Sequence, residues 1–212
     1  MSYYLIGEDV RASLSKRIHN LFGNEKYDLL SVNEEEVKKL LTSKKFLGLN
    51  VTKPYKELCL NYLDEIDDLA KKIGAVNIIL NKNNKLIGYN SDYYGLKYLL
   101  DKNNVILENK DILILGTGGS AKMVEYLAND LKAKSVTFVS RNKVGKNVIS
   151  YQDVKKIKAN ILFNTTPIGQ NPFAHQMPNI DLKNIVGLTV VVDLNYNPLK
   201  NLLLQNAESL DI

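Results

Sequence analysis

The chain has 212 residues, of which 45% are hydrophobic and 24% are charged, and it carries a formal net charge of +5 at pH 7. This balance is typical of a folded globular protein and excludes a largely disordered one. Its apolar runs fall far short of the roughly 20 residues that a membrane helix needs, so no membrane partner is expected. Residues 1–7 lack the features of a signal peptide, and Cys59 is the single cysteine. We expect a cytoplasmic protein without disulfides or a cysteine-based zinc site.

The positive charges are spread along the chain and alternate with acidic residues on the predicted helices. Because no compact basic block stands out, a nucleic-acid partner is not expected. A solvated surface of lysines explains the charge balance, and such a surface can help to attract small anions.

In chain order, the first half alternates apolar runs with helical patterns. Strands are predicted at residues 3–6, 46–51, 76–80 and 86–90, and helices around residues 14–22, 34–41 and 64–72. Asn33 precedes three glutamates and is expected to cap the second of these helices. Pro54 suits the first turn of a further helix that would carry Lys56. Gly74 is expected to end the helix that begins near residue 64.

The second half begins after a polar segment, and we place a domain boundary near residue 103. Strands are predicted at residues 111–115, 135–139, 161–164 and 189–193, and helices at residues 119–129 and 153–158. Strands and helices that alternate at this spacing predict a parallel sheet covered on both faces. The predicted fold class is therefore α/β with two domains.

A glycine-rich turn lies between the strand at residues 111–115 and the helix that follows it. Its six residues, Gly116-Thr117-Gly118-Gly119-Ser120-Ala121, fit the pattern G-x-G-x-x-G/A. In that pattern the first glycine permits a tight turn, the second lets the backbone approach a pyrophosphate, and the third position keeps helix and strand close. A glycine turn without a ligand is the alternative. The position of the turn before a helix N-terminus favours nucleotide binding.

The next strand end bears on the choice of cofactor. An NAD enzyme usually places an acidic residue there, whereas this chain has Ser140-Arg141-Asn142. Arg141 could pair with a 2′-phosphate, an interaction that an acidic residue would oppose. NADP is thus favoured over NAD, and a solvated loop arginine is the alternative.

Polar residues gather at three predicted strand ends in the first half, where open α/β sheets place their ligands. The three clusters are Ser13 with Ser15, residues 50–56, and Asn77 with residues 90–92. Taken singly, each has an ordinary structural explanation, because Ser and Thr cap helices while Asn and Asp form turns.

Together with the glycine turn, these clusters resemble the shikimate dehydrogenase family across nearly the whole chain. The paired serines Ser13-Leu14-Ser15 resemble that family's serine motif, and the glycine turn resembles its glycine loop. The remaining motifs that match in order are Asn50-Val51-Thr52-Lys53-Pro54-Tyr55-Lys56 (N-V-T-x-P-x-K), Gly74-Ala75-Val76-Asn77 (G-A-V-N), Asn90-Ser91-Asp92 (N-T-D), Asn164-Thr165-Thr166-Pro167 (N-A-T-P) and Asp193-Leu194-Asn195-Tyr196-Asn197-Pro198 (D-x-x-Y-x-P).

The resemblance implies NADP-dependent, reversible reduction of 3-dehydroshikimate to shikimate, on the route to chorismate and the aromatic amino acids. It implies a catalytic pair, Lys56 and Asp92. The implied substrate-binding residues are Ser13, Ser15, Thr52, Lys56, Asn77, Asp92 and Tyr196. The implied cofactor-binding residues are Gly116, Thr117, Gly118, Gly119, Ser120, Ala121, Ser140, Arg141, Asn142, Thr165, Thr166, Pro167 and Leu194.

The resemblance also implies the limits of the domains. Residues 1–102 would form an α/β substrate-binding catalytic domain, residues 103–200 a Rossmann-like NADP-binding domain with a parallel sheet, and residues 201–212 a short C-terminal helix. We expect a monomer or a homodimer. Because His19 and His175 have no acidic partner at metal-ligand spacing, no metal is expected.

The chemistry of the implied pair leaves two roles open for Lys56. Oxidation of an alcohol needs a group that takes the hydroxyl proton while the nicotinamide takes a hydride. A lysine acts as a base near neutral pH only if its environment lowers its pKa, and a neighbouring carboxylate acts in the opposite direction. A lysine that stays charged could instead polarise the carbonyl during reduction.

The sequence departs from the family in two places. The stretch between Arg141 and Asn164 is shorter, and the chain ends at Ile212 whereas the family continues into a segment with a glycine-rich turn and a glutamine. We expect a short form, and a natural short form, a truncated chain and a substrate-binding relative without efficient catalysis all remain open. A dehydrogenase of quinate or of an amino analogue of shikimate is the other alternative.

Overall fold

The computed structural model describes residues 2–24, 26–142 and 145–212, and the chain divides into two compact units, Met1–Gly95 and Leu96–Ile212. The boundary falls inside one helix, α4 (Asp92–Lys102). Contacts along the chain define compact units and not functions, so the functional limits at residues 102 and 200 remain predictions. Among the described residues, no helix is long and apolar enough to span a bilayer.

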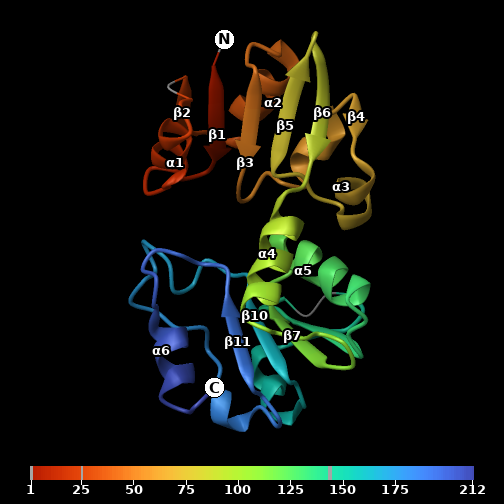
Figure 1. Ribbon diagram of the computed structural model, residues 1–212, viewed down its shortest axis with the longest axis vertical. Coiled ribbons are helices and arrows are strands. Elements are labelled where there is room, and N and C mark those ends of the chain that lie inside the picture. The colour runs from red at the N-terminus through yellow and green to blue at the C-terminus, as the bar shows by residue number, and fades with distance from the viewer. Residues whose placement is uncertain (1, 25, 143–144) are drawn as a thin grey trace. The chain divides into compact units, whose positions relative to one another are not determined.

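The first unit contains a mixed sheet with the strand order β2-β1-β3-β5-β6-β4 (Figure 1). Its strands are β1 (Tyr3–Gly7), β2 (Tyr27–Ser31), β3 (Gly48–Val51), β4 (Glu65–Ile66), β5 (Ile78–Lys82) and β6 (Lys85–Tyr89). Strand β1 runs parallel to both β2 and β3, whereas β5 runs antiparallel to both β3 and β6. This topology places the ends of β1 and β3 side by side, since Ile6 pairs with Val51.

The helices of this unit are α1 (Ser15–Leu21), α2 (Glu34–Ser43) and α3 (Asp68–Ile73), together with the 3-10 helix η1 (Leu58–Tyr62). The expected cap of α2 is confirmed as a capping box, in which the Asn33 side chain accepts from the Glu36 N–H and the Glu36 side chain accepts from the Asn33 N–H. Gly74 ends α3 in a left-handed conformation, as predicted. Helix α2 contributes Val37 and Leu41 to a core that also holds Phe46 and Ile79.

Two sequence expectations for this unit are wrong in detail. Residues 54–56 lie in turns before η1 and not in a helix. The segment expected as one helix from residue 64 is divided into β4 and α3, because Glu65 and Ile66 pair with β6. The sequence pattern predicts neither helix α4 nor strand β2, which is an edge strand of mixed polarity.

The second unit contains the predicted parallel sheet, with the strand order β11-β10-β7-β8-β9. Its strands are β7 (Asp111–Leu115), β8 (Ser135–Val139), β9 (Val148–Ile149), β10 (Ile161–Asn164) and β11 (Val190–Asp193), and every pairing between them is parallel. Its other elements are α5 (Gly119–Asp130), α6 (Leu202–Glu208) and the 3-10 helices η2 (Tyr151–Lys156) and η3 (Leu182–Asn184). The helix expected at residues 153–158 is thus the 3-10 helix η2.

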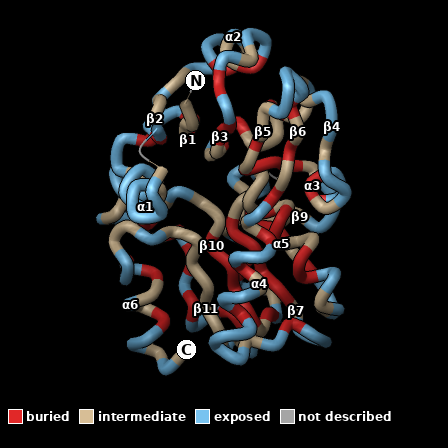
Figure 2. Tube along the Cα trace, turned by 45° about the horizontal axis from the view of Figure 1, so that its top comes forward, coloured by how far each residue is buried: buried red, intermediate tan, exposed pale blue. Residues whose placement is uncertain are grey.

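Both faces of this sheet are covered. Leu113 and Leu115 of β7 pack in one cluster with Leu182 of η3 and Leu203 of α6. Successive side chains of a strand alternate in direction, so Ile112 and Ile114 point to the opposite face. Helix α5 packs against β7 and β8 on that side (Figure 1). The continuous burial of β7 and β10 in Figure 2 is typical of a parallel sheet buried on both faces.

Candidate functional site

In the first unit, an ion pair joins the two residues expected to be catalytic. Lys56 Nζ donates to Asp92 Oδ2 at 2.5 Å, and the two side chains are 14% and 32% exposed. Lys56 lies in the turn after β3, and its carbonyl accepts from the Val76 N–H at 2.9 Å. Asp92 is the first residue of α4, where the helix dipole favours a carboxylate. The pair is therefore held at both ends by backbone structure while its side chains remain partly exposed.

Asn77 fixes the second oxygen of the Asp92 carboxylate. Its Nδ2 donates to Asp92 Oδ1 at 2.7 Å and to Ser91 Oγ at 3.0 Å, while its Oδ1 accepts from the Ser91 N–H at 2.8 Å. Asn90 braces the same segment, because its Nδ2 donates to the Ala75 carbonyl and its Oδ1 accepts from the Asp92 N–H. The two motifs that carry Asn77 and Asp92 are thus joined side chain to side chain.

The predicted site residue Thr52 lies directly after β3. Its N–H donates to the Ile6 carbonyl at 2.9 Å, which ties the end of β3 to β1. A Cβ at Gly7 would lie 2.5 Å from Thr52 Cγ2. Gly7 is therefore required for Thr52 to approach β1 this closely.

The two predicted serines contact each other at the start of α1. Ser13 Oγ donates to Ser15 Oγ at 3.1 Å, and the Ser15 N–H donates back to Ser13 Oγ at 3.2 Å. Near this pair, Tyr27 OH donates to Asn50 Oδ1 at 2.7 Å, and Asn50 Nδ2 lies 3.5 Å from the Asn77 carbonyl. A line of polar groups therefore runs from Tyr27 through Asn50 to Asn77, with Ser15 near its Tyr27 end.

Tyr27, Asn50 and Ser91 take part in these contacts although the sequence motifs predict no role for them. Asn50 could have been identified from the sequence, because it is the first residue of the motif that contains Thr52. No sequence feature identifies Tyr27, because it lies on the edge strand β2, which the sequence pattern does not predict.

A further cation, Lys53, lies between Thr52 and Pro54. Burial lowers the pKa of Lys53, and the nearby charges of Asp9 and Glu8 act in the opposite sense. Burial therefore acts against the charged form of Lys53, and the two acidic residues act in favour of it.

The glycine turn of the second unit has the backbone that its sequence predicts. Gly116 has a φ of +104°, and a Cβ there would lie 2.7 Å from Thr165 Oγ1, so a larger residue is excluded. A Cβ at Gly118, in contrast, would meet no atom within 4 Å. Ala121 is fully buried near the start of α5. Packing therefore does not require a glycine at position 118, and open backbone before the N-terminus of α5 fits a dinucleotide pyrophosphate.

The other residues expected to bind the cofactor lie at the same edge of this sheet. Residues 140–142 follow β8, residues 165–167 follow β10 and Leu194 follows β11. Because all these strands are parallel, their carboxyl ends meet at the edge where β7 leads into the glycine turn. Arg141 is exposed, and its charge acts on Tyr151, whose pKa is raised by burial.

Asp193 joins two of these loops. Its carboxylate accepts from Asn164 Nδ2 at 2.9 Å, from Asn201 Nδ2 at 2.8 Å and from the Asn195 N–H at 2.8 Å. Asn195 in turn donates to the carbonyls of Thr166 and Ile168. Burial raises the pKa of Asp193, although these hydrogen bonds act to lower it. The carboxylate thereby fixes the loops after β10 and β11 relative to each other.

Tyr196 belongs to this second unit and is 42% exposed. The other predicted substrate residues belong to the first unit, so the expected contact of Tyr196 with a substrate stays a prediction. The expectation that no metal binds is likewise a prediction; within the described ranges, no group of three or more His, Cys, Asp or Glu side chains could hold one.

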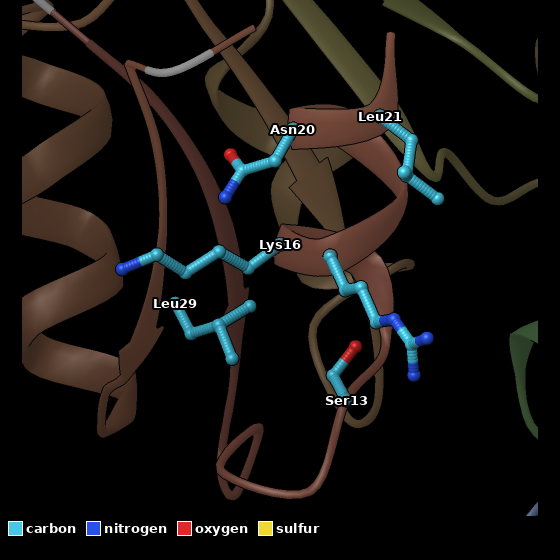
Figure 3. A pocket seen from close by; sticks show the side chains of 6 residues that line it. Ser13, Lys16, Asn20, Leu21 and Leu29 are labelled. Carbon is cyan, nitrogen blue, oxygen red and sulfur yellow. The ribbon is translucent and has the colours of Figure 1, made fainter. Parts of the chain in front are cut away.

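A surface hollow of about 530 Å³ lies beside α1 and β2 (Figure 3). Of the residues that line it, Ser13 belongs to the predicted substrate set, and Lys16 and Arg17 supply positive charge. Lys16 reaches past Leu29 in Figure 3 and pairs with Asp28 at 2.9 Å. The hollow does not include Lys56 or Asp92, so the site is assigned from the hydrogen-bonded side chains and not from this hollow.

Known proteins resemble this chain over nearly its whole length. Residues 5–79 match the family described as the shikimate dehydrogenase substrate binding domain. The shikimate dehydrogenase (NADP(+)) of Clostridium beijerinckii is 41% identical, over 92% of this chain and 78% of its own length. This chain belongs to the shikimate dehydrogenase family. A relative of the same name from Methanococcus maripaludis is 39% identical, over 96% of this chain and 80% of its own length.

Solved structures of the family share the fold. Shikimate dehydrogenase 1 from Peptoclostridium difficile is 34% identical with a TM-score of 0.89, over 99% of this chain and 83% of that one. The Thermus thermophilus enzyme in complex with NADP(H) and shikimate is 26% identical with a TM-score of 0.82, over 99% and 84%. The family resemblance and the two-domain α/β fold inferred from the sequence are thus confirmed.

Proposed function

We propose that this member of the shikimate dehydrogenase family catalyses the NADP-dependent, reversible reduction of 3-dehydroshikimate to shikimate. The observation that carries the proposal is the ion pair between Lys56 and Asp92, held by Asn77 and partly exposed. The named activity of the relatives supports it, since the curated relatives described above are NADP(+) enzymes and the Thermus thermophilus structure holds NADP(H) and shikimate.

The pair suits the proton transfer that accompanies the reaction. NADP, when bound, supplies the hydride acceptor for shikimate oxidation and NADPH the hydride donor for the reverse. Lys56 Nζ lies within hydrogen-bond distance of Asp92, so the two groups together can take the hydroxyl proton as the carbonyl forms and return it on reduction. Asn77 holds the Asp92 carboxylate in one orientation, which keeps the pair aligned. Lys56 acts either as the base or as a charged group that polarises the carbonyl.

The remaining residues divide between substrate and cofactor. We assign the hydroxyls of Ser13, Ser15 and Thr52, with Asn77, to the carboxylate and hydroxyls of the substrate, and Tyr196 as a further ligand. We assign the glycine turn to the pyrophosphate of NADP, Arg141 to its 2′-phosphate and the loops after β10 and β11 to its remaining contacts. A cytoplasmic location, a monomeric or homodimeric state and the lack of a nucleic-acid or membrane partner remain our expectations.

The test is formation of reduced cofactor on mixing the purified chain with shikimate or quinate, each with NADP and with NAD. We expect NADPH from shikimate and NADP at the highest rate. A higher rate with quinate would instead assign the enzyme to quinate. If no cofactor is reduced although shikimate raises the melting temperature, the chain is a substrate-binding relative without catalysis, and the proposal is wrong.

A further inference from the structure

Tyr27 is a buried tyrosine at the edge of the first sheet. It opens β2, is 2% exposed and stacks on His19 of α1, with ring centroids 3.7 Å apart and ring planes 9° apart. The stack fixes the ring between an edge strand and a helix. The phenol oxygen is thereby placed among the polar groups of the predicted substrate site.

The hydroxyl of Tyr27 contacts two of these groups. It donates to Asn50 Oδ1 at 2.7 Å, and the Ser15 side chain lies near enough to act on the pKa of the phenol. Burial raises the pKa of Tyr27 to about 12, against the effect of the bond with Ser15. The phenol therefore stays neutral, with one proton to donate, over the whole physiological pH range.

The single hydroxyl proton of Tyr27 fixes the donor and the acceptor in its hydrogen bonds with Asn50 and Ser15. Because Tyr27 donates its one proton to Asn50 Oδ1, it can only accept a hydrogen bond from Ser15. The Asn50 amide is oriented by the same bond, so its Nδ2 faces the Asn77 carbonyl at 3.5 Å. Without the phenol, the Ser15 hydroxyl could rotate among its staggered positions and the Asn50 amide could flip.

We propose that Tyr27 is a positioning residue that holds Ser15 and Asn50 in the orientations that bind the substrate. The inference rests on the proposed function, and it adds a residue from β2 that touches neither the catalytic pair nor the cofactor. Tyr27 acts on binding in the ground state and not on the proton transfer at Lys56 and Asp92. Its loss should therefore separate substrate affinity from turnover.

Tyr27→Phe keeps the ring, its burial and the stack on His19 while it removes the hydroxyl. We expect the KM for shikimate to rise about fivefold, the effect of losing one ordering hydrogen bond. The kcat and the KM for NADP should stay within about twofold, since neither depends on ground-state order at Ser15. Calorimetric Kd values for shikimate without cofactor should rise by the same factor as the KM.

Tyr55→Phe is the matched control. Tyr55 is buried in the same unit, and its hydroxyl donates to the Val32 carbonyl at 2.7 Å, equal in length to the Tyr27 bond. We expect both variants to lose similar stability in denaturant, whereas the control keeps the wild-type KM. An equal rise in KM in both variants would mean that Tyr27 has a general structural role, and the proposal would be wrong.

A double-mutant cycle with Ser15→Ala tests the route of the effect. If Tyr27 acts through Ser15, adding Tyr27→Phe to Ser15→Ala should weaken shikimate binding by less than about twofold. Additive losses would contradict the claim that Tyr27 positions Ser15. If the wild-type protein binds shikimate but does not oxidise it, only the proposed function is wrong, because the Kd values still test the role of Tyr27. If the wild-type protein does not bind shikimate, both proposals are wrong.

Discussion

The two units build their candidate sites in different ways. In the second unit, the candidate cofactor site lies at the carboxyl ends of parallel strands, and its main predicted element is the backbone of one short glycine turn. In the first unit, the candidate site consists of side chains from segments far apart in sequence, such as Lys56 and Asp92, which the fold of the mixed-sheet unit brings into contact. The comparison teaches that a backbone site tolerates side-chain changes except at its glycines, whereas a side-chain site depends on each member.

The largest effect should follow from loss of Lys56. Lys56→Ala should lower kcat by about a hundredfold to ten-thousandfold, the range for loss of a proton-transfer group, while shikimate affinity falls far less. Lys85→Ala is the control, because Lys85 forms an exposed ion pair with Glu65 in the same unit, and we expect wild-type kinetics from it. Equal losses of turnover and affinity in Lys56→Ala would contradict a catalytic role. Steady-state kinetics with calorimetric binding distinguishes these results.

Two glycines of the second unit should separate folding from cofactor binding. Gly116→Ala forces a side chain into a left-handed backbone and against Thr165, so we expect a loss of about 1–3 kcal/mol in the free energy of unfolding. Gly118→Ala meets no atom within 4 Å and should leave stability unchanged.

Both glycine variants should bind NADP about tenfold more weakly, since one distorts the turn and the other adds a methyl group where the pyrophosphate approaches. Shikimate binding should be unaffected in both. Unchanged NADP affinity in Gly118→Ala would show that the open backbone of the turn does not contact the cofactor. Denaturant unfolding and calorimetric titration measure the two effects.

Asp193 should show that the second unit also depends on a few buried side chains. In Asp193→Asn, one amide nitrogen would face hydrogen-bond donors from Asn164, Asn195 or Asn201, so we expect a loss of about 1–3 kcal/mol in unfolding free energy.

The pH dependence of the same site follows from the raised pKa of Asp193. A carboxyl whose pKa is raised on folding stabilises the protein below its unfolded pKa, and this contribution is lost as the pH rises through the folded value. Between wild type and Asp193→Asn, the difference in unfolding free energy should therefore shrink as the pH rises above about 3.8. A difference that does not change with pH would contradict the account. Denaturant titrations at several pH values provide the measurement.

The smallest effect should come from Arg141, which is exposed. Arg141→Ala should reduce the preference for NADP over NAD by about fivefold, as expected for one solvated charge pair with a phosphate. The ratio of kcat/KM for the two cofactors measures it. If the ratio does not change, Arg141 is a solvated loop residue and another group selects the cofactor.

The parts of the molecule that the sequence predicted are those that local rules decide. The cap at Asn33, the helix end at Gly74 and the glycine turn each depend on a few adjacent residues. The same rules failed where distant pairing overrides local pattern: residues 65 and 66 form a strand because β6 lies beside them, and Lys56 lies in a turn and not in a helix.

The candidate site could be predicted in part for the same reason. Lys56, Asn77 and Asp92 follow from the family motifs, and the structure joins them by hydrogen bonds. Tyr27 could not be predicted, because its relation to Ser15 and Asn50 depends on where β2 pairs in the sheet. Tertiary contacts alone reveal such a residue.

The most direct test of the central claim, that the side-chain pair in the first unit performs the proton transfer, is Asp92→Asn. This change keeps the shape of the side chain and removes its charge. We predict that NADPH formation from shikimate falls by at least about tenfold while the calorimetric Kd for NADP stays unchanged and that for shikimate changes less than kcat. Turnover at the wild-type rate would contradict the claim, because the carboxylate that pairs with Lys56 would then be dispensable.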